Sequence, residues 1–125
     1  SFVLTSILNL PSLEAAVVHR VATRLGHPAL SVDMISQTFM TAIEHDDAIG
    51  RAFRADILAV ADRDPACTRL MEPVLYFKGF HALQTHRLAH WLWQQGRQDF
   101  ALYLQSRSSE VFQTDINPAV VMGKG

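Results

Sequence analysis

The segment from residue 74 to residue 95 limits the fold of this chain more than any other. It reads as a single helix interrupted only by Gly79, and large apolar residues surround most of it: Val74, Leu75, Phe77, Phe80, Leu83, Leu88, Trp91 and Leu92. A helix that is apolar on nearly all sides has to be buried. We therefore expect residues 74–95 to form the central helix of a helical domain.

The remaining chain divides into further helical segments, separated by proline, glycine and short polar turns. Apolar residues recur at helical spacing within these segments, and none alternates apolar and polar residues for long enough to form a strand. The pattern predicts helices over residues 1–9, 12–25, 32–43, 48–63 and 97–112. The fold class expected for residues 1–112 is all-α, a multi-helix bundle. Its predicted core stripes are Leu13, Val17, Val21 and Leu25; Val32, Ile35, Phe39 and Ile43; and Ile49, Phe53, Ile57 and Val60.

Single residues mark where several of these helices begin, end and pair. Ser31 is placed to cap the N-terminus of the third helix, and Asp46 or Asp47 that of the fourth. Gly26 is placed as a left-handed C-terminal stop of the second helix. Arg107 shares a face with apolar residues of the last helix, so we expect it near a buried or interfacial carboxylate.

Length, charge and cysteine content restrict the class of protein. A chain of 125 residues suits a single domain, and a net charge of −1 gives no basic surface for nucleic acid. Its longest apolar runs fall short of the roughly 18 residues that a membrane span needs. The single cysteine, Cys67, fits a reducing compartment. We expect a cytoplasmic protein with neither nucleic acid nor membrane as a partner.

The last residues of the chain differ in character from the helices. Ile116 and Met122 are six residues apart, the small residue Val120 lies four after Ile116, and Gly123 directly follows Met122. This spacing is typical of a hexapeptide repeat, in which an aliphatic residue turns inward once per face of a left-handed parallel β-helix. Residues 113–125 are therefore predicted to begin such a β-helix, although so short a stretch cannot bury its own faces without stacked neighbours.

Two histidines of the central helix, His86 and His90, lie four residues apart on one face. This spacing can bind zinc, but no glutamate follows His86 in the His-Glu-x-x-His manner and no third ligand is evident. Hydrogen-bonded histidines in a packed helix are the favoured interpretation, and no metal site is predicted. His81 lies five residues before His86 and is expected to point elsewhere.

Three stretches together resemble the serine acetyltransferase family. They are Arg63-Asp64-Pro65-Ala66, the run from Tyr76 to Gln84 continued by His90-Trp91-Leu92-Trp93, and Asp115-Ile116-Asn117-Pro118-Ala119. The resemblance implies an N-terminal helical domain followed by a left-handed parallel β-helix. It implies a homo-oligomer in which the β-helices form trimers and the helical domains join two trimers, and a C-terminal tail that binds cysteine synthase.

The resemblance also implies a reaction and roles for two carboxylates. The reaction is acetyl transfer from acetyl-CoA, the co-substrate, to the hydroxyl of L-serine, giving O-acetyl-L-serine for cysteine biosynthesis. Asp64 matches the carboxylate that binds the substrate's ammonium group, and Asp115 matches the one paired with the catalytic histidine. Without the resemblance, Asp64 would be a plain helix cap before proline and Asp115 a turn carboxylate. Asn117 departs from the family, which usually has histidine there.

The catalytic histidine implied by the resemblance would lie about fifteen residues after Asp115, beyond Gly125. The coils that bind coenzyme A are expected there too, so no cofactor is predicted on these 125 residues, and the chain alone is expected to be inactive. Histidine suits the reaction because its pKa near neutrality lets it take the hydroxyl proton, and a carboxylate on the other ring nitrogen fixes its tautomer. The alternative interpretation is a non-catalytic helical module that serves oligomerisation.

Overall fold

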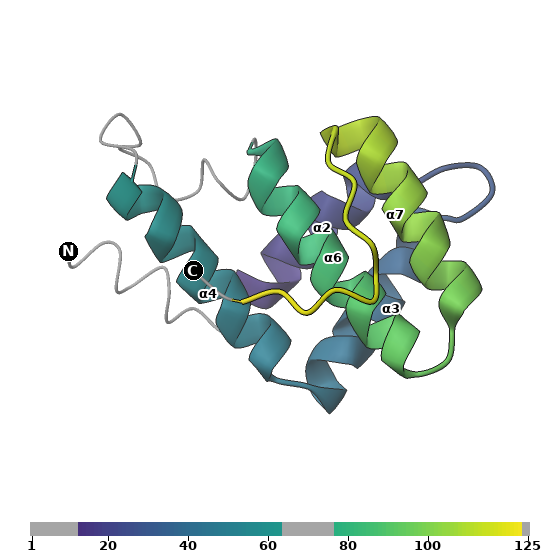
Figure 1. Ribbon diagram of the computed structural model, residues 1–125, viewed down its shortest axis with the longest axis horizontal. Helices are drawn as coiled ribbons and strands as arrows, with labels where there is room; N and C mark the ends of the chain where they lie inside the picture. The colour runs from purple at the N-terminus through teal and green to yellow at the C-terminus, as the bar shows by residue number, and fades with distance from the viewer. Residues whose placement is uncertain (1–12, 64–76, 124–125) are drawn as a thin grey trace.

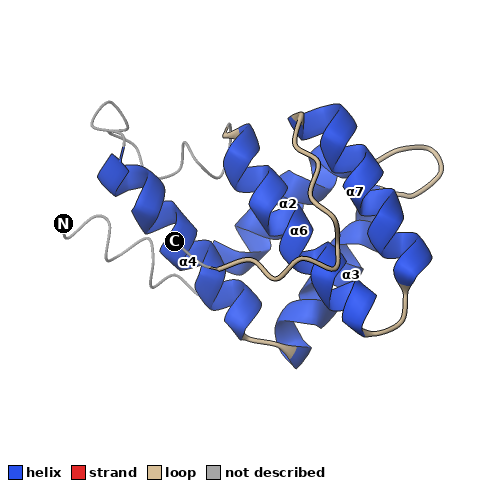
Figure 2. Cartoon of the chain, viewed as in Figure 1, coloured by secondary structure: helices blue, strands red, loops and turns tan. Residues whose placement is uncertain are grey.

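The computed structural model describes residues 13–63 and 77–123, and these residues form five helices and an irregular C-terminal segment (Figures 1 and 2). The helices are α2 (Leu13–Leu25), α3 (Val32–His45), α4 (Ala48–Arg63), α6 (Lys78–Gln94) and α7 (Gln98–Phe112). No strand occurs in the described ranges, where the backbone pairing between His27 and Leu30 is an isolated bridge. The predicted all-α body is confirmed. Within these residues, no helix has the length and apolar content to span a membrane.

Helix α6 lies at the centre of the bundle, as the sequence predicts. It packs along α7 over much of its length and also contacts α2, α3 and α4. Leu88 and Leu92 are fully buried, but so are polar side chains of the same helix, among them His81 and Gln84. Burial of α6 is therefore confirmed, whereas the side chains that surround it are more polar than the apolar pattern suggested.

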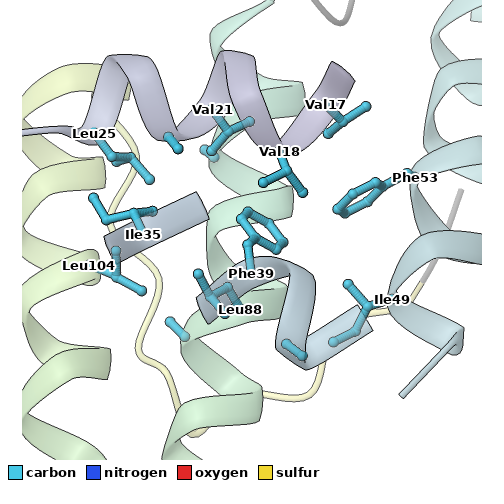
Figure 3. Close-up of a cluster of buried hydrophobic side chains, with 14 of the residues drawn as sticks. Val17, Val18, Val21, Leu25, Ile35, Phe39, Ile49, Phe53, Leu88 and Leu104 are labelled. Atoms are coloured by element: carbon cyan, nitrogen blue, oxygen red, sulfur yellow. The ribbon is translucent and has the colours of Figure 1, made fainter. Parts of the chain in front are cut away.

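The apolar faces of the outer helices meet in one core, which Figure 3 shows from close range. Phe39 of α3 and Phe53 of α4 pack edge to face with ring centroids 5.6 Å apart. Residues from every described helix complete this core, including Val17, Val21, Leu25, Ile35, Ile49, Ile57, Leu88 and Leu104. Most members of the predicted stripes are buried, so helical periodicity identified the core faces correctly. The side chain of Val60 lies outside the described part.

Two of the predicted helix caps are confirmed, and α2 ends at Leu25, directly before Gly26, as predicted, but the left-handed conformation expected of Gly26 is wrong. Ser31 Oγ accepts a hydrogen bond from Met34 N at 3.2 Å, and Asp46 Oδ1 accepts one from Ala48 N at 3.1 Å. Gly26 does not have a positive φ. A Cβ atom at Gly26 would instead lie 2.4 Å from Cγ2 of Val32. Glycine is required there because α3 begins so close to the end of α2.

Arg107 joins α7 to the C-terminus of α2. Its Nε donates to Leu25 O at 3.1 Å and a terminal nitrogen donates to Gly26 O at 3.2 Å. The carboxylate that it contacts, at 2.6 Å, belongs to Glu110, whose side chain is 69% exposed. Arg107 thus contacts a carboxylate, as expected, but within this chain that carboxylate is exposed and not buried. Arginine is suited to this place because its several N–H groups satisfy the free carbonyls at the end of a helix.

Candidate functional site

Residues 113–123, here called the C-terminal segment, lie across the surface of α6. Gln113 has left-handed dihedral angles, φ 59° and ψ 32°, and turns the chain away from the end of α7. The segment then crosses α6 towards α4, as the yellow trace in Figure 1 shows. Ile116 and Met122 are half-buried while Val120 and Val121 are exposed. Residues 113–123 contain no strand, so the start of a β-helix over 113–125 stays a prediction.

His86 and His90 of α6 hold the C-terminal segment through its backbone carbonyls. His90 Nδ1 lies 2.9 Å from Pro118 O, and His86 Nε2 lies 2.7 Å from Val120 O. Both histidines are therefore hydrogen-bonded in a packed helix, as the favoured interpretation of their spacing predicted. His81 points elsewhere, as expected, with its Nδ1 2.8 Å from a terminal nitrogen of Arg24 on α2.

A buried polar network on α4 and α6 provides a third attachment of the segment. Asp56 Oδ2 accepts hydrogen bonds at 2.7 Å from Gln84 Nε2 and from a terminal nitrogen of Arg87. Arg87 Nε donates to Gln84 Oε1 at 3.1 Å, and the terminal nitrogen that faces Asp56 also donates to Gly123 O at 3.2 Å. Since all three side chains are buried, their polar groups need these partners. The network connects the core of the bundle to the end of the described chain.

Asp115, the residue predicted to pair with a catalytic histidine, is exposed at the start of the segment. Gln105 Nε2 of α7 donates to Asp115 Oδ1 at 2.6 Å. The neighbouring residue Ile116 shares a small cavity of about 10 Å³ with residues of α6 and α7, among them Ala82, Ala89 and Ser108. Asp115 is thus held by one side chain and open to a further partner.

Asn117 shapes the turn that follows Asp115. Its Oδ1 accepts a hydrogen bond from Ala119 N at 2.9 Å, and its carbonyl accepts one from Val120 N at 3.0 Å. An asparagine that bonds the backbone two residues later is a common turn-forming arrangement. Pro118 fits the second position of this turn because its φ is fixed. The side chain at 117 is therefore used for local structure.

The electrostatics of His86 favour a neutral imidazole. Burial lowers the pKa of His86, the hydrogen bond to Val120 O opposes this effect, and the charges of His90 and Arg87 lower the pKa further. Nδ1 of His86 is buried and has no hydrogen-bond partner among the residues that the structure describes. Protonation would place a second N–H group at that position, which is a physical reason for the lowered pKa.

A cleft of about 300 Å³ lies between the start of α4, α6 and the end of the C-terminal segment. Ile49, Trp91 and Met122 give it apolar walls, and Asp46 and His90 add polar groups. In the described ranges, no three residues of the His, Cys, Asp and Glu types are placed to bind a metal ion. Asp64, predicted to bind substrate, and Cys67 lie outside the described residues, so the structure does not place Asp64 relative to Asp115.

Comparison with known sequences identifies the family. The sequence model described as "Serine acetyltransferase, N-terminal" matches residues 1–85. The chain belongs to the serine acetyltransferase family. Among curated members, it is 46% identical over 125 residues to serine acetyltransferase 4 of Arabidopsis thaliana and 39% identical over 125 residues to serine acetyltransferase of Escherichia coli K12. The whole chain is covered in both alignments, but it spans only 35% and 46% of those two relatives.

Solved structures of serine acetyltransferases share this fold. The serine acetyltransferase of Brucella abortus strain S19 in complex with coenzyme A superposes with a TM-score of 0.89 at 62% identity, over 98% of this chain and 49% of that one. A serine acetyltransferase in complex with cysteine superposes with the same TM-score at 36% identity, over 98% of this chain and 51% of that one. The resemblance seen in the sequence is confirmed at the level of family.

Sequence reasoning missed Gln105, Asp56 and the network around Arg87. Gln105 carries no local signal, because its partner Asp115 lies ten residues later beyond a helix end. Asp56 and Arg87 are 31 residues apart. A charged residue within a predicted buried helix was the available signal, since such a residue needs a buried partner.

Proposed function

We propose that the protein containing this chain is a serine O-acetyltransferase, which transfers an acetyl group from acetyl-CoA to the hydroxyl of L-serine. The product would be O-acetyl-L-serine, a precursor in cysteine biosynthesis. The observation that carries this proposal is the likeness to the coenzyme A complex of the Brucella abortus enzyme, which extends over nearly the whole chain at high identity.

In this proposal Asp115 orients the catalytic base. The serine hydroxyl must lose a proton as its oxygen attacks the thioester carbonyl, and a histidine expected beyond Gly125 would accept that proton. A carboxylate on the other ring nitrogen holds the imidazole in the required tautomer and stabilises the imidazolium. The exposure of Asp115 and its bond to Gln105 support this role, because one oxygen is held by Gln105 and the carboxylate stays open to another partner.

Asp64 is proposed to bind the ammonium group of serine, on the family resemblance alone. Fixing the substrate by its charged end would turn a bimolecular encounter into an oriented one. Residues after 113 are proposed to lead into a left-handed β-helix that binds coenzyme A. The half-buried positions of Ile116 and Met122, six residues apart, support that continuation.

We further propose that the intact protein is a homo-oligomer, a dimer of trimers joined through the helical domains. It is proposed to act in the cytoplasm and to bind cysteine synthase through a C-terminal tail. The exposed apolar side chains of Met34 and Leu102 are available for contacts between subunits. Sedimentation of the intact protein tests this assembly, and a monomer at micromolar concentration would contradict it.

The activity is tested with the intact protein, L-serine and acetyl-CoA, by following release of the coenzyme A thiol and formation of O-acetyl-L-serine. We expect Asp115→Asn to lower kcat by about a hundredfold or more, since it keeps an acceptor for Gln105 but removes the charge. Asp99→Asn is the matched control, because Asp99 is an exposed aspartate in the first turn of α7 and should leave kcat unchanged. Absence of serine-dependent thiol release by the unmutated protein would refute the proposed function.

A further inference from the structure

Side chains of α6 bind three carbonyl groups within six residues of the C-terminal segment. As the segment proceeds from Pro118 through Val120 to Gly123, its partners are His90, His86 and Arg87. Over this stretch the segment crosses α6, from His90 to the turn of the helix that contains His86 and Arg87. Its described internal hydrogen bonds are those of the turn at Asn117. Beyond that turn, the bonds from α6 hold residues 118–123 in place.

The carbonyl partners define the tautomer of each histidine. A carbonyl oxygen only accepts hydrogen bonds, so the ring nitrogen that faces it must carry the hydrogen. His86 therefore has its hydrogen on Nε2, and His90 has its hydrogen on Nδ1. The two rings lie on one helix face with centroids 6.0 Å apart, yet they are required in opposite tautomers. Neither ring can shift to its other neutral tautomer without losing its bond to the segment.

We propose that His86 and His90 are positioning residues, which hold the C-terminal segment against α6 in opposite imidazole tautomers and thereby fix the carboxylate of Asp115 for the reaction. This inference rests on the function proposed above. Asp115 lies three residues before Pro118, and the turn at Asn117 joins the two. A segment released from α6 would leave Asp115 attached through Gln105 alone among the contacts described.

Because the two tautomers are opposite, they can be tested with two double variants that contain the same amino acids in exchanged positions. The amide nitrogen of asparagine takes the place of His Nδ1, and that of glutamine takes the place of His Nε2. The double variant His86→Gln/His90→Asn keeps both donors in place and is called the matched variant. The double variant His86→Asn/His90→Gln contains the same residues in exchanged positions and is called the crossed variant. Both lose both imidazoles, so general effects on the helix are alike.

The experiment measures two quantities on the intact protein. Hydrogen–deuterium exchange of peptides that cover residues 113–123 reports release of the segment, and kcat for O-acetyl-L-serine formation reports positioning. We expect the crossed variant to exchange about five- to tenfold faster than the unmutated protein and to lose at least as much in kcat, from loss of two hydrogen bonds. The matched variant should stay within about twofold in both.

The outcomes separate this inference from the proposed function. If the two double variants behave alike in exchange, whether both are normal or both are fast, the position of the donor does not matter and the inference is wrong. If exchange follows the expected pattern but kcat does not, the segment is held and the positioning role is refuted. If exchange follows the pattern and even the unmutated protein forms no O-acetyl-L-serine, the hold of α6 on the segment stands and the proposed function fails.

Discussion

Replacing Asp56 by asparagine tests whether the buried network on α4 and α6 stabilises the fold. Asparagine keeps the size of the side chain and an acceptor oxygen, but removes the negative charge 2.7 Å from the Arg87 guanidinium. Arg87 would then be a buried cation whose other described partners, Gln84 Oε1 and Gly123 O, are neutral. The free energy of unfolding should therefore fall.

The burial of the Arg87–Asp56 pair determines how far the free energy of unfolding should fall. The Arg87 and Asp56 side chains are 7% and 4% exposed. Removing one partner of such a pair costs about 3–5 kcal/mol, which is a large share of the roughly 5–15 kcal/mol that stabilises a typical domain. Because asparagine still accepts a hydrogen bond, we expect Asp56→Asn to cost about 3 kcal/mol, at the lower end of that range.

The exposed pair of Arg51 and Asp47 provides a control of equal chemistry. Its nitrogen and oxygen lie 2.8 Å apart, but the two side chains are 58% and 83% exposed. Water hydrates both charges and weakens their attraction, so Asp47→Asn should cost less than about 1 kcal/mol, including the loss of a favourable charge at the start of α4. Urea unfolding followed by far-ultraviolet circular dichroism measures both variants. If Asp56→Asn costs no more than Asp47→Asn, burial does not strengthen the pair and the reasoning is refuted.

Three further predictions test single positions by the same unfolding measurement. Gly26→Ala should cost about 1–3 kcal/mol because its Cβ would overlap Val32, and it should cost clearly less in a Val32→Ala background; an equal cost in both backgrounds would contradict the close approach. Ser31→Ala should cost about 1 kcal/mol through loss of the cap of α3, and Ser31→Asp should restore most of it; no recovery would argue against capping. The pKa of His86 is lowered on folding, so below about pH 6.5 the unfolded chain binds a proton at this residue more readily than the folded chain does. The free energy of unfolding should therefore decrease as the pH falls below about 6.5, by at most about 1.4 kcal/mol per pH unit from this group. His86→Gln should lose less stability than the unmutated protein between pH 7.5 and pH 5.5, and an equal loss would show that another group is responsible.

Local rules were sufficient for most of the bundle. The last helix was predicted over 97–112 and runs over Gln98–Phe112, with Arg97 as its N-cap after the turn at Gly96, which adopts φ 80°. Ser31 was identified from its place before an apolar face, and its cap depends on atoms only three residues apart. The central helix was predicted over residues 74–95. It ends at Gln94, close to the prediction, but begins only at Lys78, because Phe77 is extended and is its N-cap. In each case the deciding interaction lies within one or two turns of the residue concerned.

Contacts between distant segments were beyond reach of the same rules. Gly26 was predicted to have a left-handed conformation, but glycine is needed there because a Cβ atom would overlap Val32 at the start of the next helix. Arg107 was expected near a buried or interfacial carboxylate; it contacts the exposed carboxylate of Glu110 and also donates to two carbonyl groups more than 80 residues earlier. The type of side chain was informative in both cases, whereas its partner depends on how α2, α3 and α7 pack.

Helix α6 is buried although many of its side chains are polar, because some of these side chains bond the backbone of the segment that covers it. Leu88 and Leu92 face the core, whereas His86 and His90 face the backbone of the C-terminal segment. If other helices covered this face of α6, it would need apolar residues, because the backbone carbonyl groups of a neighbouring helix are already hydrogen-bonded within that helix. A helix covered by an irregular segment has to supply hydrogen-bond donors, because carbonyl groups of that segment such as those of Pro118 and Val120 are bonded by side chains of the helix. The polar positions of α6 therefore determine the path of the chain after α7, and with it the place of Asp115.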